Sequence, residues 1–170
     1  IQTFKNNCQT VQSYLDDFVN ENVDYKKYYN DTCEIRGTSF NSTGSMSVED
    51  RISTHKEMWS KYDFKISDSI EYLPGVNAKT KQMDGSVRFY FDWTTTNTEN
   101  NKSITIPLYM SFDFDQEGRF VYLQYFGDIS SALSPNTTVT AALTGTTATI
   151  HSIDTELNLL TLKDVKGIFN

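Results

Sequence analysis

The chain has 170 residues, of which 38% are apolar and 14% aromatic, values typical of a globular protein with a buried core. Its formal net charge is −7 and no Lys/Arg-rich run occurs, which argues against nucleic acid or an anionic membrane as a partner. The apolar runs are short and interrupted, so we expect no segment that spans a membrane.

Helices are predicted in the N-terminal part of the chain, where apolar side chains recur with helical spacing. In the first helix, Val11, Tyr14 and Phe18 share one face. Ser47 is a suitable N-cap for the third helix, because Asp50 follows it three positions later. The predicted elements are a helix at 9–22, a short helix at 23–31, a strand at 32–40 and a helix from 47 to about 62.

Residues 64–129 are predicted to form four long strands joined in sequence as a meander. Two of these strands alternate apolar and polar side chains, the pattern of a sheet with one buried face. Pro74-Gly75 indicates a turn, and Pro107, which has no backbone donor, indicates a sheet edge or a bulge. The side chains expected on the buried face are Val87, Phe89, Phe91, Trp93, Ile104, Ile106, Leu108, Met110, Phe112 and Phe114.

Helices segregated from an antiparallel sheet define an α+β fold. The apolar sheet face needs cover, and only the helices can supply it, so we expect a strongly curved, cone-shaped sheet packed on the helices, with a cavity at its open end. This domain comprises residues 1–133. Residues 134–170 are predicted to form a C-terminal β-hairpin extension, too short for a core of its own, that packs on the domain or on a partner subunit.

Cys8 and Cys33 could form a disulfide in an exported protein or remain two buried thiols, and both readings stay open. The chain begins at Ile1 and not at Met, which fits a trimmed sequence or a removed signal peptide, so an exported location stays open as well. No Cys/His cluster or metal-binding motif occurs, and we expect neither a metal nor a cofactor.

Four segments resemble the nuclear transport factor 2-like superfamily, in particular its SnoaL-like and ketosteroid-isomerase-like branch. They are VQSYLDDFV, YYNDTCEIRG, SVEDRISTHKEMW and SFDFDQEGRFVYLQYFGDI, and with the order of elements they extend the resemblance over residues 9–133. The resemblance implies that functional residues lie inside the cone. It also implies a homodimer formed through the outer sheet face, where Tyr90 and Tyr109 would suit an interface.

The chemistry of the ketosteroid isomerases is not expected in this chain. The resemblance implies an Asp base near the end of the first strand, with a Tyr and a protonated Asp as donors to an oxyanion. Tyr14 matches the donor Tyr, but the segment of the base offers Glu34 and Arg36, and Met110 occupies the position of the donor Asp. Two of the three functional positions are therefore lost.

His55 lies on a helical stripe with Val48, Ile52, Trp59 and Tyr62 that we expect to face the sheet. One reading is a packed core residue that hydrogen-bonds a backbone carbonyl, and this reading is favoured. The other is a catalytic base, for which Glu34 would be the orienting carboxylate and Tyr14 the donor.

Two functions follow from these candidates. The favoured one is a non-catalytic binding or interaction module that uses the cavity for a small apolar ligand or the sheet for dimerisation, because the inward strand faces carry no carboxylate. The alternative is a small acid/base enzyme, a cyclase, isomerase or dehydratase, that uses His55 and Tyr14. The candidate ligand-binding residues are Arg36 for a carboxylate and an apolar set that could equally fill the core, namely Trp59, Phe89, Phe91, Trp93, Met110 and Phe112.

Overall fold

The computed structural model describes residues 1–38, 44–133, 138–140, 147–154 and 159–166. The chain divides into two units, residues 1–133 and residues 134–170. Within the described residues, no helix combines the length and the apolar character needed to cross a membrane. Cys8 and Cys33 are both free thiols, so the structure has no disulfide between them.

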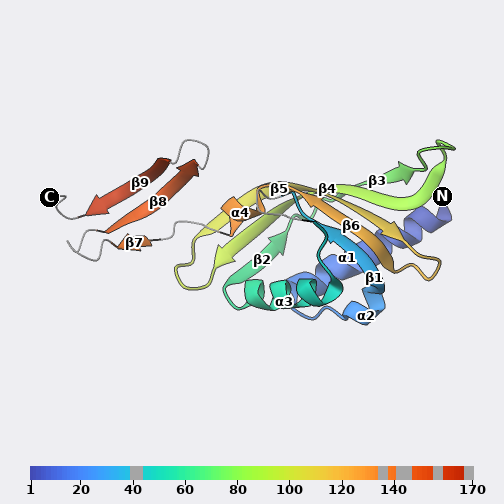
Figure 1. The fold of residues 1–170 in the computed structure, drawn as a ribbon, viewed down its shortest axis with the longest axis horizontal. Helices are drawn as coiled ribbons and strands as arrows, with labels where there is room; N and C mark the ends of the chain where they lie inside the picture. Colours follow the sequence, from blue (N-terminus) through green and yellow to red (C-terminus); the bar gives the residue numbers. More distant parts are fainter. Residues whose placement is uncertain (39–43, 134–137, 141–146, 155–158, 167–170) are drawn as a thin grey trace. The chain divides into compact units, whose positions relative to one another are not determined.

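The helices of the first unit cover one side of its sheet, as Figure 1 shows. Helix α1 begins well before the predicted helix, because its apolar face continues through Phe4 and Cys8, which pack against the core. Helix α3 begins with the predicted cap: Ser47 Oγ accepts a hydrogen bond from the Asp50 backbone N–H, and the Asp50 carboxylate accepts one from the Ser47 backbone N–H. The four helices are α1 Gln2–Val19, α2 Tyr25–Tyr28, α3 Val48–Trp59 and α4 Ile129–Ala132.

The sheet of the first unit is curled and mixed, with the strand order β1-β6-β5-β4-β2 and with β3 also paired to β4. β1 runs parallel to β6, and the other pairs are antiparallel. The predicted cone-shaped α+β fold is confirmed, with one parallel pair added to the expected antiparallel sheet. The strands are β1 Tyr29–Arg36, β2 Tyr62–Ile66, β3 Glu71–Val76, β4 Met83–Asn97, β5 Ser103–Phe114 and β6 Phe120–Phe126.

One predicted strand of the meander is two strands in the structure. β4 is 15 residues long, and β2 and β3 pair with different parts of it. Ile66 of β2 lies opposite Trp93, and Glu71 of β3 lies opposite Tyr90. The turn predicted at Pro74-Gly75 is therefore wrong, since both residues lie within β3. Pro74 is tolerated there because, in the described sheet, β3 pairs with β4 on one side, so the missing backbone donor of Pro74 can face the unpaired side.

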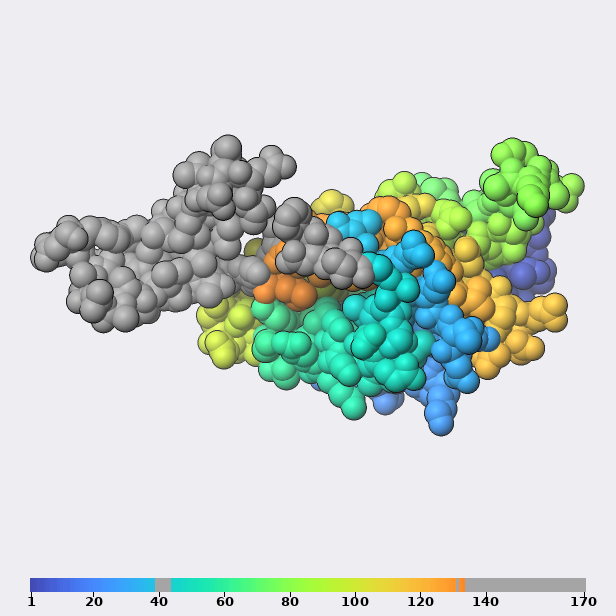
Figure 2. Space-filling model, in the orientation of Figure 1, coloured from blue at the N-terminus to red at the C-terminus, as the bar shows by residue number. Residues whose placement is uncertain are grey.

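The core lies between the helices and the inner face of the sheet, where the alternation placed it. Phe89, Leu108 and Phe112 are all buried. In β5, pairing with β6 reaches only as far as Tyr109, so the predicted local edge at Pro107 is confirmed. Figure 2 shows α3 beside the α2–β1 segment on one face of the molecule. This arrangement encloses the inner sheet face and positions α3 side chains toward it.

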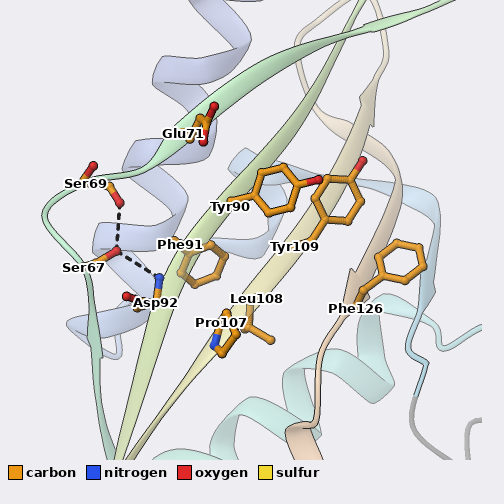
Figure 3. Close-up of a pocket in the computed structure, with 10 residues that line it drawn as sticks. All are labelled: Ser67, Ser69, Glu71, Tyr90, Phe91, Asp92, Pro107, Leu108, Tyr109 and Phe126. Carbon is orange, nitrogen blue, oxygen red and sulfur yellow. Dashed lines mark hydrogen bonds between the residues drawn. The ribbon is translucent and has the colours of Figure 1, made fainter.

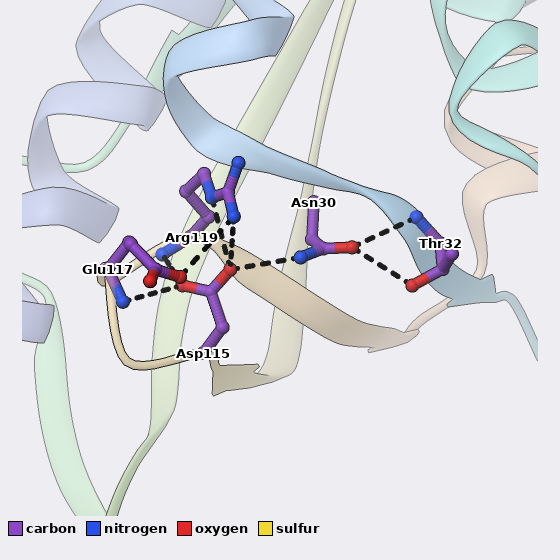
Figure 4. Close-up of polar contacts among 5 residues, drawn as sticks. All are labelled: Asn30, Thr32, Asp115, Glu117 and Arg119. Atoms are coloured by element: carbon purple, nitrogen blue, oxygen red, sulfur yellow. Dashed lines mark hydrogen bonds and ion pairs between the residues drawn. The ribbon is translucent and has the colours of Figure 1, made fainter.

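A polar cluster fixes β1 to the turn between β5 and β6 (Figure 4). Asp115 accepts hydrogen bonds from Asn30 Nδ2 and from Arg119 Nε, both at 3.0 Å. Asn30 Oδ1 in turn accepts from the backbone N–H and the hydroxyl of Thr32. The register of β1 against β6 is irregular between Tyr29 and Glu34, and the cluster holds the chain at that irregularity.

The second unit contains a small antiparallel sheet with the order β7-β8-β9. Its strands are β7 Thr138–Thr140, β8 Thr147–Asp154 and β9 Leu159–Lys166. β8 pairs antiparallel with β9. That the unit packs on the first unit or on a partner subunit stays a prediction.

Candidate functional site

A cavity of about 120 Å³ lies between α1, α3 and the inner face of the sheet. Part of its wall is apolar and is formed by Leu15, Phe18, Phe91, Trp93, Leu108 and Met110. Another part carries polar side chains, among them Tyr14 from α1 and Arg51 and His55 from α3. The cavity therefore brings together five of the residues that the sequence singled out, namely Tyr14, His55, Phe91, Trp93 and Met110.

The other four candidates do not line this cavity. Arg36 is exposed at the end of β1, where its guanidinium lies 3.3 Å from the Glu34 carboxylate. Phe89 and Phe112 are fully buried, with their ring centres 5.5 Å apart, and fill the core. Trp59 is partly buried and donates from Nε1 to the backbone oxygen of Phe18 at 3.1 Å. Phe89 and Phe112 therefore fill the core, because neighbouring side chains pack against both rings and leave no space for a ligand beside them.

His55 is buried, with 2% of its surface exposed, and its ring packs against the rings of Phe18 and Trp59. The partner of its Nδ1 is the Tyr25 hydroxyl, at 2.7 Å. The prediction that the Glu34 carboxylate orients His55 is wrong, because Glu34 is exposed and pairs with Arg36. Tyr25, in the short helix α2, takes its place.

Burial and the nearby Arg51 charge lower the pKa of His55 to about 2, so the imidazole is neutral at physiological pH. Burial also raises the pKa of Tyr25 well above its ordinary value, so the phenol keeps its proton. Among the described residues, Nδ1 is the only acceptor that the Tyr25 hydroxyl contacts. The arrangement assigns the ring proton to Nε2, which has no hydrogen-bond partner in the described chain.

Arg51 was missed by the sequence analysis, although it lies one helical turn before His55. Only 7% of its surface is exposed, and its guanidinium carbon lies 5.1 Å from the centre of the Tyr125 ring. Its Nε has no hydrogen-bond partner, and no carboxylate pairs with it in the described part of the chain. The spacing of four between Arg51 and His55 was the available signal.

Tyr14 is buried in an aromatic cluster, and its oxygen accepts a hydrogen bond from the Tyr29 hydroxyl at 2.7 Å. Burial raises the pKa of both phenols, so both remain protonated. The proton of Tyr14 itself goes to no acceptor among the described residues. Tyr14, Arg51 and His55 therefore all present hydrogen-bond donors to the cavity, and none of the described residues that line it carries a carboxylate.

The outer face of the sheet carries a shallow groove of about 480 Å³ (Figure 3). The rings of Tyr90, Tyr109 and Phe126 form a continuous row along it, with centres 4.7 and 5.4 Å apart. Tyr90 is 49% exposed. This row lies on the side of the sheet opposite to the cavity, on the face for which the sequence predicts a homodimer contact.

No metal site is formed by the described residues, since no group of three or more His, Cys, Asp or Glu side chains is arranged to hold an ion. The sequence matches no protein-family model, and no curated protein matches it. The curled mixed sheet with helices on its inner face nevertheless defines a recognisable class of cone-shaped α+β proteins.

Solved structures with the same architecture identify that class. A proposed polyketide cyclase from Xanthomonas campestris pv. campestris matches with a TM-score of 0.60 at 12% identity, over 78% of this chain and 99% of that one. An LEH-like epoxide hydrolase from M. tuberculosis matches with a TM-score of 0.54 at 14% identity, over 73% and 84%. A nuclear transport factor 2-like protein of unknown function from Exiguobacterium sp. 255-15 matches with a TM-score of 0.51 at 14% identity, over 70% and 98%. The chain has the nuclear transport factor 2-like fold, as the resemblance implied.

Proposed function

We propose that residues 1–133 bind a small, mainly apolar molecule in the cavity without converting it chemically. The observation that carries this proposal is the composition of the cavity wall. Buried aromatic and aliphatic side chains would surround an apolar body, and the donors of Tyr14, Arg51 and His55 would hold one polar end. The volume of about 120 Å³ lies below the range typical of drug-sized ligands, so the ligand is small.

The protonation state of His55 supports binding over catalysis. An efficient general base has a pKa near the working pH, and the pKa of His55 is about 2. The group that holds Nδ1 is a phenol and not a carboxylate, so it would stabilise an imidazolium only weakly. A base of this strength would remove a proton only from an unusually acidic substrate.

The alternative is an acid/base enzyme that uses His55 and Tyr14, and one observation favours it. Both side chains line the same cavity, and the cyclase and the epoxide hydrolase that share this fold are described as enzymes. A negatively charged substrate beside His55 would raise its pKa toward a useful value. The pH behaviour of His55, treated in the Discussion, separates this reading from the first.

Binding in the cavity is tested by the fluorescence of Trp93, which lines the cavity, in a Trp59→Phe background that removes the only other tryptophan. We expect hexan-1-ol to change the Trp93 emission saturably. Met110→Phe fills part of the cavity and should weaken the response at least tenfold. Met83→Phe is the matched control, since Met83 is exposed outside the cavity. Equal responses in the two variants, or none in the parent, would contradict the proposal.

We further propose that two copies pair through the outer sheet face, with the row of Tyr90, Tyr109 and Phe126 at the contact. Aromatic side chains with polar tips are common in such interfaces. Light scattering should give twice the 19.5 kDa chain mass. Tyr90→Glu should shift the protein to monomer, because it places a charge in the aromatic row. Val76→Glu, which adds the same charge at another exposed position, should not. A monomeric parent protein would contradict the proposal.

A further inference from the structure

Arg51 carries a buried positive charge that the described residues do not neutralise. Only 7% of the surface of Arg51 is exposed, and its Nε lacks a hydrogen-bond partner among the described residues. An unpaired charge in a protein interior is strongly unfavourable, so buried guanidinium groups are normally paired with an anion. The arrangement is therefore incomplete as it stands.

The groups around Arg51 compensate its charge only in part. The Tyr125 ring offers a cation–π contact at 5.1 Å. The nearby phenols of Tyr14 and Tyr29 stay protonated because they are buried, so they contribute dipoles and no negative charge. The anion that would complete the pairing must come from outside the described residues.

Two further donors lie on the same cavity as Arg51. His55 follows it by one helical turn, so the two side chains share a face of α3. Tyr14 reaches the cavity from α1, and its own proton has no acceptor among the described residues. The guanidinium and the two neutral donors, with no competing carboxylate among the described wall residues, form a set of groups suited to binding the two oxygens of one carboxylate.

We infer that this polar wall binds the carboxylate of a small monocarboxylic acid whose apolar body occupies the rest of the cavity. The inference rests on the proposed function and specifies the ligand class for it. A carboxylate fits better than a phosphate, because one guanidinium balances one charge and because the adjoining wall is apolar. The body is limited by the volume of about 120 Å³ to a short chain or a single ring.

The test compares hexanoate, hexan-1-ol and inorganic phosphate by Trp93 fluorescence in the Trp59→Phe background. Hexanoate should bind at least tenfold more tightly than hexan-1-ol, since a hydrogen bond to a charged group contributes about that factor. Arg51→Met should remove the preference, so that hexanoate and hexan-1-ol bind with similar affinity. Arg88→Met is the control, because Arg88 lies outside the cavity and 4.0 Å from Asp113.

The outcomes separate the inference from the proposed function. Equal binding of hexanoate and hexan-1-ol would overturn the carboxylate site and leave the apolar cavity standing. Binding of phosphate with no preference for hexanoate would also overturn it. Failure of both organic probes to bind would overturn both proposals.

A measurement on the unmutated chain covers the case in which Arg51→Met does not fold. The Nε–H signal of Arg51, assigned by its loss in Arg51→Lys, should shift more on addition of hexanoate than on addition of hexan-1-ol. An Nε–H signal that responds to neither probe, while Trp93 reports binding of hexanoate, would place the carboxylate elsewhere and overturn the inference.

Discussion

The Phe112→Ala variant should lose about 3–5 kcal/mol of unfolding free energy, the range for removing a buried phenylalanine ring. Phe112 has no exposed surface, and its ring contacts those of Tyr14, Phe89 and Phe120. The truncation would leave a cavity that three large rings cannot close without moving off their preferred geometry. Urea denaturation followed by circular dichroism gives the free energy directly.

Met83→Ala is the control for this loss. Met83 is 43% exposed, so its truncation should cost less than about 1 kcal/mol. A similar loss in both variants would contradict the core position of Phe112. A small loss for Phe112→Ala with altered ligand binding would return Phe112 to the cavity wall, one of the two positions that the sequence left open for it.

A second large effect is expected from His55 when the pH falls. Its pKa is about 2 in the folded chain and 6.5 when unperturbed, so below pH 6.5 the unfolded chain binds a proton that the folded chain does not. Stability rises with pH wherever the unfolded state binds more protons. The contribution of a neutral His55 is therefore present above pH 6.5 and is lost as the pH falls. Between pH 7 and pH 5 the loss is about 2 kcal/mol.

The comparison with His55→Gln isolates this loss, because the amide does not titrate and all other groups are common to both proteins. The stability advantage of the parent over the variant should shrink by about 2 kcal/mol from pH 7 to pH 5. An advantage that stays constant would mean that His55 titrates normally in the folded protein. That result would favour the acid/base enzyme over the binding module.

The strands and the cap were predictable because their signals are local. Period-two alternation assigns Phe89, Leu108 and Phe112 to one face without knowledge of any partner strand. The Ser47 cap likewise depends on residues three positions apart. The division of β2 from β3 was missed because it depends on the length of β4, and strand length is not encoded in either short strand.

The polar wall of the cavity was predictable only in part. His55 stood out because a polar residue interrupts an apolar stripe, and Tyr14 stood out because it matches the donor Tyr of the superfamily that the chain resembles. Arg51 did not, since an arginine on a helix is by default solvated, and the Tyr125 ring that it contacts lies far from it in the sequence. Tyr25 could not be predicted as the partner of His55, because that prediction requires knowing that α2 lies beside α3.

The parallel pairing of β1 with β6 should affect how the first unit is assembled during synthesis. In the described sheet, β1 has β6 as its strand neighbour, and β6 ends at Phe126. Until Phe126 has emerged from the ribosome, β1 has an open hydrogen-bonding edge and the aromatic cluster around Tyr14 is uncovered. Fragments that end short of β6 should therefore recruit chaperones or aggregate, and a split protein should be rescued only when the β6 piece is supplied in trans.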